Sequence, residues 1–460
     1  MNLTNNINKY IFRGYDIRGV YPTDLNSDVA YTIGKSFGTY VKRMGKITAV
    51  VGRDNRYSSD ELANSLINGI TSTGINVIDL GLVTTPMYYY ACIKLNNPTG
   101  IMVTASHNPK DDNGFKFAFD ERGNARGEMI EEFRDFTFAM DFDNGDGTVE
   151  KYDIREEYIE LFKKSLDFGD RKIKVVIDPG NGTTSIIAKE LYEMFPLNLE
   201  VIFGESDPTF PNHHPDPCVY SNLTKLKEKV LEVNADLGIG YDGDGDRVGF
   251  IDNLGNMIET DKFMIIMWRY LYNKVEKKKA LFDVKCTKAL EDELHKLGII
   301  PIEYRTGNSY TRAATAEGDF PLGGELSGHV YFRDKFPGYD DGIYAGMRLI
   351  ELLSHTDKPL NTLLDGINKY YSTEELKVKV SDEIKFQVIE KMNQYCLKQK
   401  YNFLTIDGVK AKFDDGFALV RASNTGPNIT MRFEATTEDR LKELQEEFTR
   451  ELYNCIEEFK

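Results

Sequence analysis

Three aspartates separated by single glycines form the most distinctive segment of the chain: Asp242, Asp244 and Asp246, followed by Arg247. Alternate residues of an extended segment project to the same side, so the three carboxylates are expected to converge. The glycines permit tight turns and the close approach of a ligand. Because oxygen ligands without histidine or cysteine suit magnesium better than zinc, the segment predicts a magnesium site.

Two other interpretations of this segment compete with the metal site. A solvated acidic turn would place three like charges directly after an apolar strand, which is costly. An EF-hand loop requires glycine at its sixth position and glutamate at its twelfth. Counted from Asp242, these positions hold Arg247 and Asn253, so the EF-hand is excluded.

Ser106 lies where an apolar run, residues 100–103, gives way to a polar loop. In α/β folds ligands bind at the carboxyl ends of strands, which makes this serine a candidate nucleophile. Pro109 disfavours a helical conformation at Asn108, so the serine is expected on a constrained turn. A structural serine is the alternative, because sequence neighbours such as Ser106 and His107 seldom form a nucleophile–base pair. The sequence has no G-x-S-x-G motif to support a hydrolase triad.

Two further polar loops have the residue types that bind a sugar phosphate. Glu325, Ser327 and His329 alternate in a glycine-rich segment and can present donors and acceptors to neighbouring hydroxyl groups. Near the C-terminus a second loop combines arginines, hydroxyls and an amide, which together suit a phosphate. Its members are Arg421, Ser423, Asn424, Thr425 and Arg432. An ordinary solvated loop is the alternative in both cases.

The composition and the motifs that the sequence lacks exclude several classes of function. The chain has 460 residues, with 57 lysines and arginines against 73 aspartates and glutamates, and a formal net charge of −16. Nucleic acids and membrane surfaces are anionic, so neither is an expected partner. The five cysteines are scattered, so a disulfide framework is not expected. No apolar stretch has the length of a membrane span, and no signal peptide is recognisable. Together these observations predict a cytoplasmic protein. The sequence lacks the phosphate loops of nucleotide-dependent kinases and dinucleotide oxidoreductases.

The elements that must position these residues follow a repeated order. Residues 47–52 predict a strand, 53–74 a helix, 75–81 a strand, 84–95 a helix, and 100–106 a strand running into a loop. Such alternation implies an α/β sheet with substantial parallel character. The same order recurs twice before the pattern changes near residue 368, and the length alone predicts three or four domains.

The four polar segments, in this order and at these separations, resemble the α-D-phosphohexomutase family, specifically its phosphomannomutase/phosphoglucomutase branch. Shorter matches extend the resemblance over essentially the whole chain. They are FRGYDIRG at 12–19, GRDNR at 52–56, DPGNGT at 178–183, PNHHPDP at 211–217, FDVKCT at 282–287 and DDGIY at 340–344.

The expected fold class is therefore α/β, with four domains around a central cleft. Three topologically similar mixed α/β domains precede a smaller C-terminal α+β domain. They are expected to carry, in turn, the serine, the metal, the sugar-binding and the phosphate-binding residues. The expected domains are residues 1–153, 154–253, 254–368 and 369–460.

The resemblance implies an intramolecular phosphotransferase, an isomerase that interconverts hexose 1-phosphate and hexose 6-phosphate of mannose, glucose or both. Ser106 matches the family's phosphoserine, which transfers its phosphoryl group by way of a hexose 1,6-bisphosphate, the activator and intermediate. The three aspartates match the ligands of Mg²⁺, and a phosphoserine oxygen completes the set. The expected partners are small-molecule hexose phosphates, and the chain is expected to be a monomer or a weak homodimer.

The resemblance gives roles to other residues as well. Lys116 and His329 match residues implicated in proton transfer, and Arg247 would face the transferring phosphoryl group. His107 and Arg18 complete the expected catalytic set. Glu325 and Ser327 match residues that hold the hydroxyl groups of the sugar. The expected substrate-binding set is Tyr15, Arg305, Glu325, Ser327, His329, Arg421, Ser423, Asn424, Thr425 and Arg432.

Three positions depart from the family pattern. Arg305 and Asn308 stand where many relatives have lysine and histidine, and a guanidinium lacks the pKa and the reach of an ammonium. Gly426 stands where relatives often carry threonine or glutamate.

Three other functions stay open. One is a phosphoglucosamine mutase, whose serine and sugar loops differ slightly from those here. The others are a non-catalytic sugar-phosphate-binding homologue and a phosphatase that uses the same metal.

Overall fold

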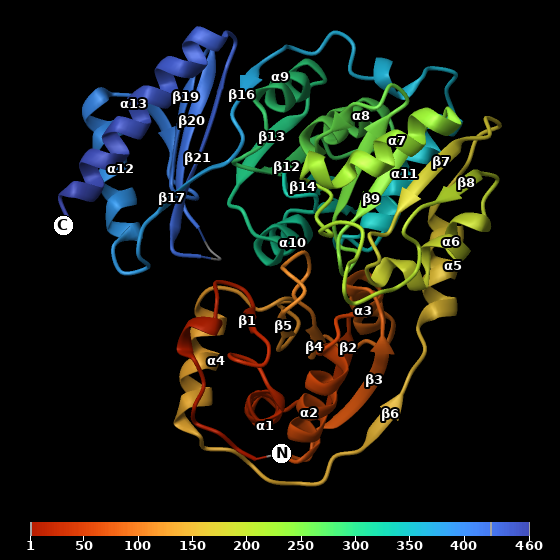
Figure 1. Ribbon diagram of the computed structural model, residues 1–460, viewed down its shortest axis with the longest axis vertical. Helices are drawn as coiled ribbons and strands as arrows, with labels where there is room; N and C mark the ends of the chain where they lie inside the picture. The colour runs from red at the N-terminus through yellow and green to blue at the C-terminus, as the bar shows by residue number, and fades with distance from the viewer. Residues whose placement is uncertain (1, 424–425, 460) are drawn as a thin grey trace. The chain divides into compact units, whose positions relative to one another are not determined.

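The computed structural model describes residues 2–423 and 426–459. The chain forms two compact units: unit 1 comprises residues 1–260 and 327–363, and unit 2 comprises residues 261–326 and 364–460. Within each unit, helices cover β-sheets (Figure 1). Among residues 2–423 and 426–459, no helix is both long and apolar enough to cross a membrane.

The first sheet of unit 1 has six strands in the order β1-β5-β4-β2-β3-β6. β2 pairs in parallel with β3 and β4, whereas β5 runs antiparallel to β4 and β1. The strands are β1 (Ile17–Val20), β2 (Thr48–Arg53), β3 (Asn76–Leu82), β4 (Gly100–Val103), β5 (Asp112–Ala118) and β6 (Val149–Lys151). The helices are η1 (Lys9–Ile11), α1 (Ser27–Arg43), α2 (Ser59–Thr71), α3 (Thr85–Lys94) and α4 (Glu128–Ala139).

Side-chain alternation divides this sheet between two helical layers. Ala49 and Val51 of β2 belong to one buried core with residues of α1, α2 and α4. Val50 points to the opposite face, where α3 contacts β2 and β4. Helix α3 begins at a Thr84 cap, whose hydroxyl accepts a hydrogen bond from Met87 N, and Pro86 fits its first turn. This helix start lies at the carboxyl end of the parallel strands, where the functional loops emerge.

The second sheet of unit 1 has the order β11-β10-β9-β7-β8. β7 is parallel to β8 and β9, and β10 is antiparallel to β9. The strands are β7 (Lys174–Asp178), β8 (Asn198–Val201), β9 (Leu237–Tyr241), β10 (Val248–Asp252) and β11 (Met257–Ile258). The remaining elements are α5 (Arg155–Ser165), η2 (Thr183–Ile186), α6 (Ala188–Glu193), η3 (Tyr220–Leu223), α7 (Thr224–Val233), β15 (Val330–Phe332), α11 (Gly342–Ser354) and η4 (Leu360–Thr362). Helix α11 contacts β9 and β10.

Unit 2 begins with a parallel arrangement in which β12 lies between β13 and β14. Its elements are α8 (Thr260–Leu271), β12 (Lys279–Asp283), α9 (Lys288–Lys296), β13 (Ile300–Tyr304), α10 (Asn308–Glu317) and β14 (Leu322–Gly324). The strand–helix–strand order predicted for this segment is therefore present. Helix α10 is an addition, because the sequence analysis assigned no element to residues 308–317.

The C-terminal part of unit 2 is an antiparallel sheet covered by two helices. Its strands are β16 (Tyr371–Ser372), β17 (Leu376–Lys379), β18 (Asn402–Leu404), β19 (Val409–Phe413), β20 (Gly416–Ala422) and β21 (Asn428–Ala435). The helices are α12 (Lys385–Gln399) and α13 (Glu438–Glu457). Ala418 and Val420 of β20 pack in the core shared with both helices, whereas Phe417 and Leu419 face Val284 on the other side.

Candidate active site

Two hairpin loops of unit 1 meet and bring the predicted chemistry together. The loop between β4 and β5 carries Ser106, and the loop between β9 and β10 carries the three aspartates. A Cβ atom at Gly243 would lie 2.5 Å from the carbonyl oxygen of Ser106. Only glycine therefore permits this approach of the two loops.

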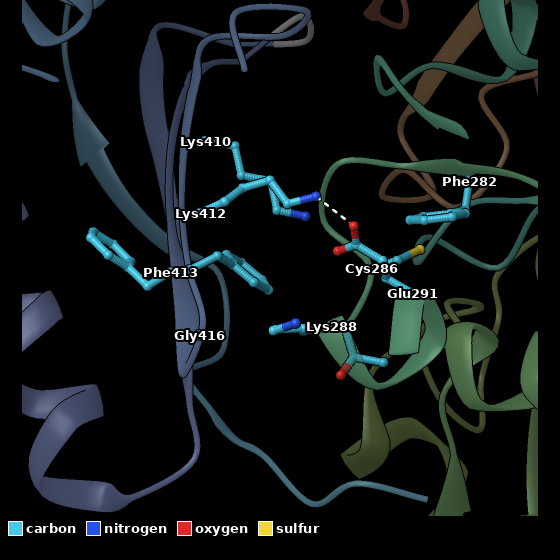
Figure 2. Close-up of a pocket in the computed structure, with 10 residues that line it drawn as sticks. Phe282, Cys286, Lys288, Glu291, Lys410, Lys412, Phe413 and Gly416 are labelled. Carbon is cyan, nitrogen blue, oxygen red and sulfur yellow. Dashed lines mark hydrogen bonds and ion pairs between the residues drawn. The ribbon is translucent and has the colours of Figure 1, made fainter. Parts of the chain in front are cut away.

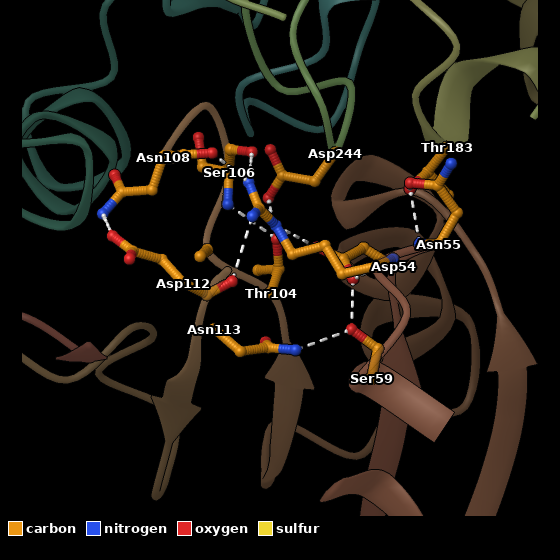
Figure 3. Close-up of polar contacts among 12 residues, drawn as sticks. Asp54, Asn55, Ser59, Thr104, Ser106, Asn108, Asp112, Asn113, Thr183 and Asp244 are labelled. Atoms are coloured by element: carbon orange, nitrogen blue, oxygen red, sulfur yellow. Dashed lines mark hydrogen bonds and ion pairs between the residues drawn. The ribbon is translucent and has the colours of Figure 1, made fainter. Parts of the chain in front are cut away.

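Ser106 is 1% exposed and its backbone φ is +54°, in the left-handed region. For a residue other than glycine this conformation costs about 1–2 kcal/mol. The serine thus lies on a constrained turn, as Pro109 had indicated. Its Oγ donates a 2.9 Å hydrogen bond to Asp242 Oδ2, and its N–H donates to Thr104 Oγ1 at 2.8 Å. Figure 3 shows Ser106 and Thr104 beside Asp244.

The three aspartates are fully buried, and one carboxylate oxygen from each lies within 4.8 Å of the others. The segment does not extend as a strand, because residues 243–246 bend between β9 and β10 and Gly245 has a φ of +83°. The carboxylates converge through this turn rather than through strand alternation. Convergence was thus predicted correctly, but for a different geometric reason.

Asp244 is held by several donors on one of its oxygens. Its Oδ2 accepts hydrogen bonds from Thr85 Oγ1 at 2.6 Å, Thr104 Oγ1 at 3.1 Å and Lys116 Nζ at 2.9 Å. Thr85 N, at the start of α3, also donates to the Asp244 carbonyl at 2.9 Å. The other oxygens, Asp244 Oδ1 and Asp246 Oδ1, are buried and have no hydrogen-bond partner within the described part of the chain.

Lys116 lies on β5 opposite Met102 of β4, and this register directs it to the aspartates. Its Nζ lies 2.9 Å from Asp244 Oδ2 and 2.6 Å from Asp246 Oδ2. Burial alone lowers the pKa of Lys116, but the two carboxylates outweigh it and raise the pKa well above its ordinary value. One ammonium therefore neutralises part of a buried triple negative charge.

The remaining negative charge is distributed unevenly. Burial, reinforced by Asp244 and Asp246, raises the pKa of Asp242 well above its ordinary value. Burial acts in the same direction on Asp244, but Lys116 and the hydrogen bond from Thr85 outweigh it and lower the pKa. Three closely spaced carboxylates with one lysine are an environment that a divalent cation would stabilise.

Arg247 links the aspartate loop to a buried histidine. Its Nε donates a 3.0 Å hydrogen bond to His329 Nε2, and its guanidinium lies 3.9 Å from Asp242 Oδ2. His329 is 3% exposed, and its Nδ1 lies 2.8 Å from Asp340 Oδ2. Asp340 lies in the family-like segment DDGIY, but the sequence analysis assigned it no role.

Two other predicted residues of unit 1, His107 and Arg18, contact the serine loop. His107 Nδ1 lies 3.2 Å from Ser106 Oγ, so these sequence neighbours do contact each other. Burial and the nearby Arg247 hold the pKa of His107 well below its ordinary value, which keeps the imidazole neutral. Arg18 donates to the carbonyl of Ala105 at 2.7 Å. Tyr15 and Ser327 are partly buried.

Unit 2 carries a separate basic cluster. Strand alternation places Arg421 on the same face of β20 as Leu419, away from α12 and α13. Its Nε donates to Asp407 Oδ2 at 2.9 Å, and its buried Nη2 has no hydrogen-bond partner within the described residues. Lys285 and Arg432 each lower the pKa of the nearby Glu375, Lys285 most strongly. Three cationic side chains, those of Lys285, Arg421 and Arg432, therefore lie near one another among carboxylates, and such guanidinium and ammonium groups can bind a phosphate.

The rest of the predicted sugar and phosphate residues also have defined places. Glu325 is 1% exposed and accepts a hydrogen bond from Gly307 N at 3.2 Å, and Ser423 is 7% exposed. Arg305 lies over the Tyr310 ring at 4.1 Å, and Asn308 begins helix α10. Asn424 and Thr425 lie outside the described residues.

A small hollow in unit 2 lies between α9 and the β19–β20 hairpin (Figure 2). Its volume of about 10 Å³ accommodates no more than a water molecule. Lys412, which lines it, pairs with Glu291 at 2.7 Å and Glu303 at 2.6 Å. The hollow therefore belongs to the packing of unit 2 and is too small for a sugar phosphate.

Sequence reasoning missed the residues that shape these loops. Thr85, Arg56 and Lys285 contact the site or its backbone, and the sequence analysis gave them no role. For Arg56 and Lys285 a signal was available, because both lie in the short family-like segments GRDNR and FDVKCT, directly after buried strands. Thr85 follows a strand and begins a helix, a common ligand position in α/β folds.

Comparison with known proteins gives matches along nearly the entire chain. Family models described as phosphoglucomutase/phosphomannomutase alpha/beta/alpha domains I, II and III match residues 9–143, 156–255 and 259–370, and the C-terminal domain of that family matches 375–451. A phosphomannomutase/phosphoglucomutase of Pseudomonas syringae is 39% identical over 444 residues, covering 96% of this chain and 95% of the relative. A phosphoglucomutase of Neisseria gonorrhoeae is 36% identical and covers 96% of each chain.

A solved structure gives the same result. A phosphoglucomutase/phosphomannomutase family protein from Burkholderia thailandensis has a TM-score of 0.90 and 35% identity, and the alignment covers 98% of each chain. An N-acetylphosphoglucosamine mutase from Aspergillus fumigatus, at 14% identity and a TM-score of 0.62, shares the fold alone. These matches confirm the predicted α/β class with three similar domains and a smaller C-terminal one.

Proposed function

Because the chain belongs to the phosphoglucomutase/phosphomannomutase family, we propose that it interconverts hexose 1-phosphates and hexose 6-phosphates with Ser106 as the phosphoryl carrier. One observation supports the carrier assignment above all others. The Ser106 hydroxyl donates a 2.9 Å hydrogen bond to Asp242, within a buried group of three carboxylates. Such a site can orient an attacking hydroxyl and accept its proton, and a cation bound by the carboxylates can neutralise the charge of a phosphoryl group.

The aspartate cluster fits a magnesium ion. Asp244 Oδ1 and Asp246 Oδ1 are buried carboxylate oxygens without a hydrogen-bond partner in the described structure, and Asp242 lies within reach of the same point. Burying such oxygens without a partner is unfavourable, whereas oxygen ligands without sulfur or nitrogen suit Mg²⁺. We propose these three residues and Ser106 as its ligands. When bound, the ion supplies positive charge that neutralises a phosphoryl group during transfer.

The chain's own residues would carry out the transfer. A sugar hydroxyl attacks the phosphorus of phospho-Ser106, the bond from phosphorus to the serine oxygen breaks, and the hydroxyl proton passes to a neighbouring base. We propose His329 as this base and Lys116, whose raised pKa keeps it an ammonium, as a proton donor, because both are buried beside the aspartates. Arg247 would stabilise the charge on the phosphoryl oxygens. The hexose 1,6-bisphosphate then returns its other phosphoryl group to Ser106.

The residues of unit 2 would recognise the substrate. We propose that Arg421 and Arg432, with Ser423, bind the phosphate that is not transferred. The buried Nη2 of Arg421 supports this role, since it has no partner among the described residues. Glu325, which is buried, would accept hydrogen bonds from hydroxyl groups of the sugar. Arg305 is held over Tyr310, which supports a fixed charge at this position rather than proton transfer.

The cellular setting is part of the same proposal. All five cysteines are free thiols, and Cys286, Cys396 and Cys455 are buried. Free thiols are typical of reducing compartments, which supports a cytoplasmic enzyme. Its partners would be small hexose phosphates. A monomer or a weak homodimer is proposed, to be measured by sedimentation.

The proposal is tested by measuring conversion of mannose 1-phosphate and glucose 1-phosphate into the 6-phosphates, with a trace of hexose bisphosphate. Ser106→Ala should abolish turnover and the phosphate detected on the intact protein by mass spectrometry. Ser65→Ala is the matched control, because Ser65 is equally buried but lies in α2 and donates only to the Glu61 carbonyl. Full activity of Ser106→Ala would overturn the carrier assignment. Faster turnover of glucosamine 1-phosphate would indicate a phosphoglucosamine mutase, and release of free phosphate a phosphatase.

A further inference from the structure

The guanidinium of Arg56 binds the backbone of the serine loop rather than its side chains. Its Nη2 donates to the carbonyl oxygens of Ser106 and Asn108, both at 2.7 Å. Its Nη1 donates to the carbonyl oxygens of Pro109 at 2.6 Å and Asp112 at 3.0 Å. One side chain, 2% exposed, therefore joins four carbonyl groups spread over seven residues.

Arg56 is itself held in place. Its Nε lies 3.3 Å from Asp54 Oδ2, and its own N–H donates to Asp54 Oδ1 at 3.0 Å. Asn113 in turn donates to the hydroxyl of Ser59, which contacts the same Asp54 carboxylate (Figure 3). The guanidinium is therefore fixed by an ion pair and a buried polar network before it contacts the loop.

The donors of Arg56 leave little capacity for a phosphate. The four N–H bonds of its two terminal nitrogens are directed at the four carbonyl groups, and its Nε faces Asp54. Arg56 therefore differs from Arg247, whose guanidinium contacts side chains of the site. Its contribution to the reaction has to pass through the shape of the loop.

We propose that Arg56 is a positioning residue that holds the loop at residues 105–112 in the shape that presents Ser106 for phosphoryl transfer. The inference rests on the proposed role of Ser106 as carrier. Ser106 has a left-handed φ, an unfavourable conformation that persists only when surrounding contacts impose it. The planar fork of a guanidinium can bind several carbonyl groups in fixed directions, whereas the ammonium of lysine cannot span them.

The first test compares Arg56→Lys with Arg53→Lys. Arg53 lies three residues earlier and is partly exposed, and it makes one ion pair with Asp60 at 2.9 Å. We expect Arg56→Lys to lower kcat about 100-fold with little change in KM, because displacing a reacting group by about 1 Å has that effect. Amide hydrogen exchange at residues 105–112 should accelerate in the same variant. Arg53→Lys should change neither quantity.

Two results of this comparison would overturn the inference. One is a wild-type kcat in Arg56→Lys. The other is a reduced kcat with unchanged amide exchange at residues 105–112, since the effect would then not pass through the loop. Ser106→Ala separates this inference from the proposed function. If that variant stays active, the carrier assignment is wrong, whatever Arg56→Lys shows.

Arg56→Ala covers the case in which the lysine variant does not fold. Its full-length protein is assayed with and without guanidinium chloride at millimolar, non-denaturing concentrations, with sodium chloride at equal ionic strength as the control. We expect guanidinium to recover at least tenfold in kcat and to slow amide exchange at residues 105–112. An absence of recovery in Arg56→Ala would count against positioning by the guanidinium.

Discussion

His329 Nδ1 lies 2.8 Å from Asp340 Oδ2, and His329 Nε2 accepts a hydrogen bond from Arg247. Because Nε2 accepts a hydrogen bond from Arg247, its lone pair lies there, and the proton of a neutral imidazole is on Nδ1, beside Asp340. Asp340, which the sequence analysis did not single out, therefore lies on the protonated side of this proposed base.

Asp340→Asn should therefore lower kcat while leaving KM nearly unchanged. The amide of asparagine can donate as well as accept, so it no longer selects one tautomer, and part of the acid–base contribution, about 10- to 100-fold, should be lost. Steady-state kinetics would measure the effect. Thermal unfolding serves as the control, and a loss of activity that only follows a loss of folded protein would contradict the prediction.

Lys116→Met tests the balance of charge between β5 and the aspartate loop. Removing one partner of a buried ion pair typically costs about 3–5 kcal/mol, so the melting temperature in EDTA should fall markedly. Magnesium should raise the melting temperature of this variant more than that of the wild type, because the ion replaces missing positive charge. Lys110→Met, an exposed change in the same loop region, is the control. Equal stability of Lys116→Met and the wild type in EDTA would refute the argument.

Gly243→Ala tests the close approach of the two loops. The added Cβ would lie 2.5 Å from the Ser106 carbonyl, so one loop must shift and activity should fall more than tenfold. Gly45→Ala is the control, because Gly45 has a φ of +83° but open space around it. The control should lose about 1 kcal/mol of stability and no activity. Wild-type activity in Gly243→Ala would contradict the contact.

Glu434 should make unit 2 less stable as the pH rises. It is 2% exposed and accepts a hydrogen bond from Lys288 N at 2.7 Å, and burial raises its pKa to about 7 from an ordinary 4.5. Between these values the unfolded chain has released its proton while the folded chain keeps it. Stability therefore decreases from pH 4.5 to pH 7, by at most about 3 kcal/mol.

Glu434→Gln removes this titration and can still accept the hydrogen bond from Lys288. Its melting temperature should match that of the wild type at pH 4.5 and exceed it at pH 8. Glu446→Gln, an exposed change on α13, should show no such difference. A constant difference between Glu434→Gln and the wild type across this range would contradict the raised pKa.

The elements of the first α/β segment could be predicted because their periodicity is strong. The apolar run before Ser106 became β4, and the helix predicted at residues 84–95 became α3. Helix α10 was missed because its sequence, NSYTRAATAE, mixes strong helix formers such as alanine with asparagine, serine and threonine and has no clear apolar stripe. Its N-cap residue, Gly307, has no side chain that could mark the start of the helix.

The residues of the site also fall into those that the sequence identified and those that it did not. Residues with distinctive chemistry, such as the three aspartates and Ser106, could be identified from type and spacing. Arg56 lies in the family-like segment GRDNR, but its role could not be identified, because it binds backbone carbonyl groups and no sequence pattern displays such contacts. Asp340 was missed for a related reason, since its contact with His329 depends on how β15 and α11 are connected.

The left-handed backbone at Ser106 also decides which amino acid can occupy the carrier position. Threonine has an equivalent hydroxyl, but a β-branched side chain is strongly disfavoured at a positive φ. Two side chains with the same oxygen chemistry are therefore not interchangeable here. The selection is stereochemical, and it is made by the main chain before any substrate is bound.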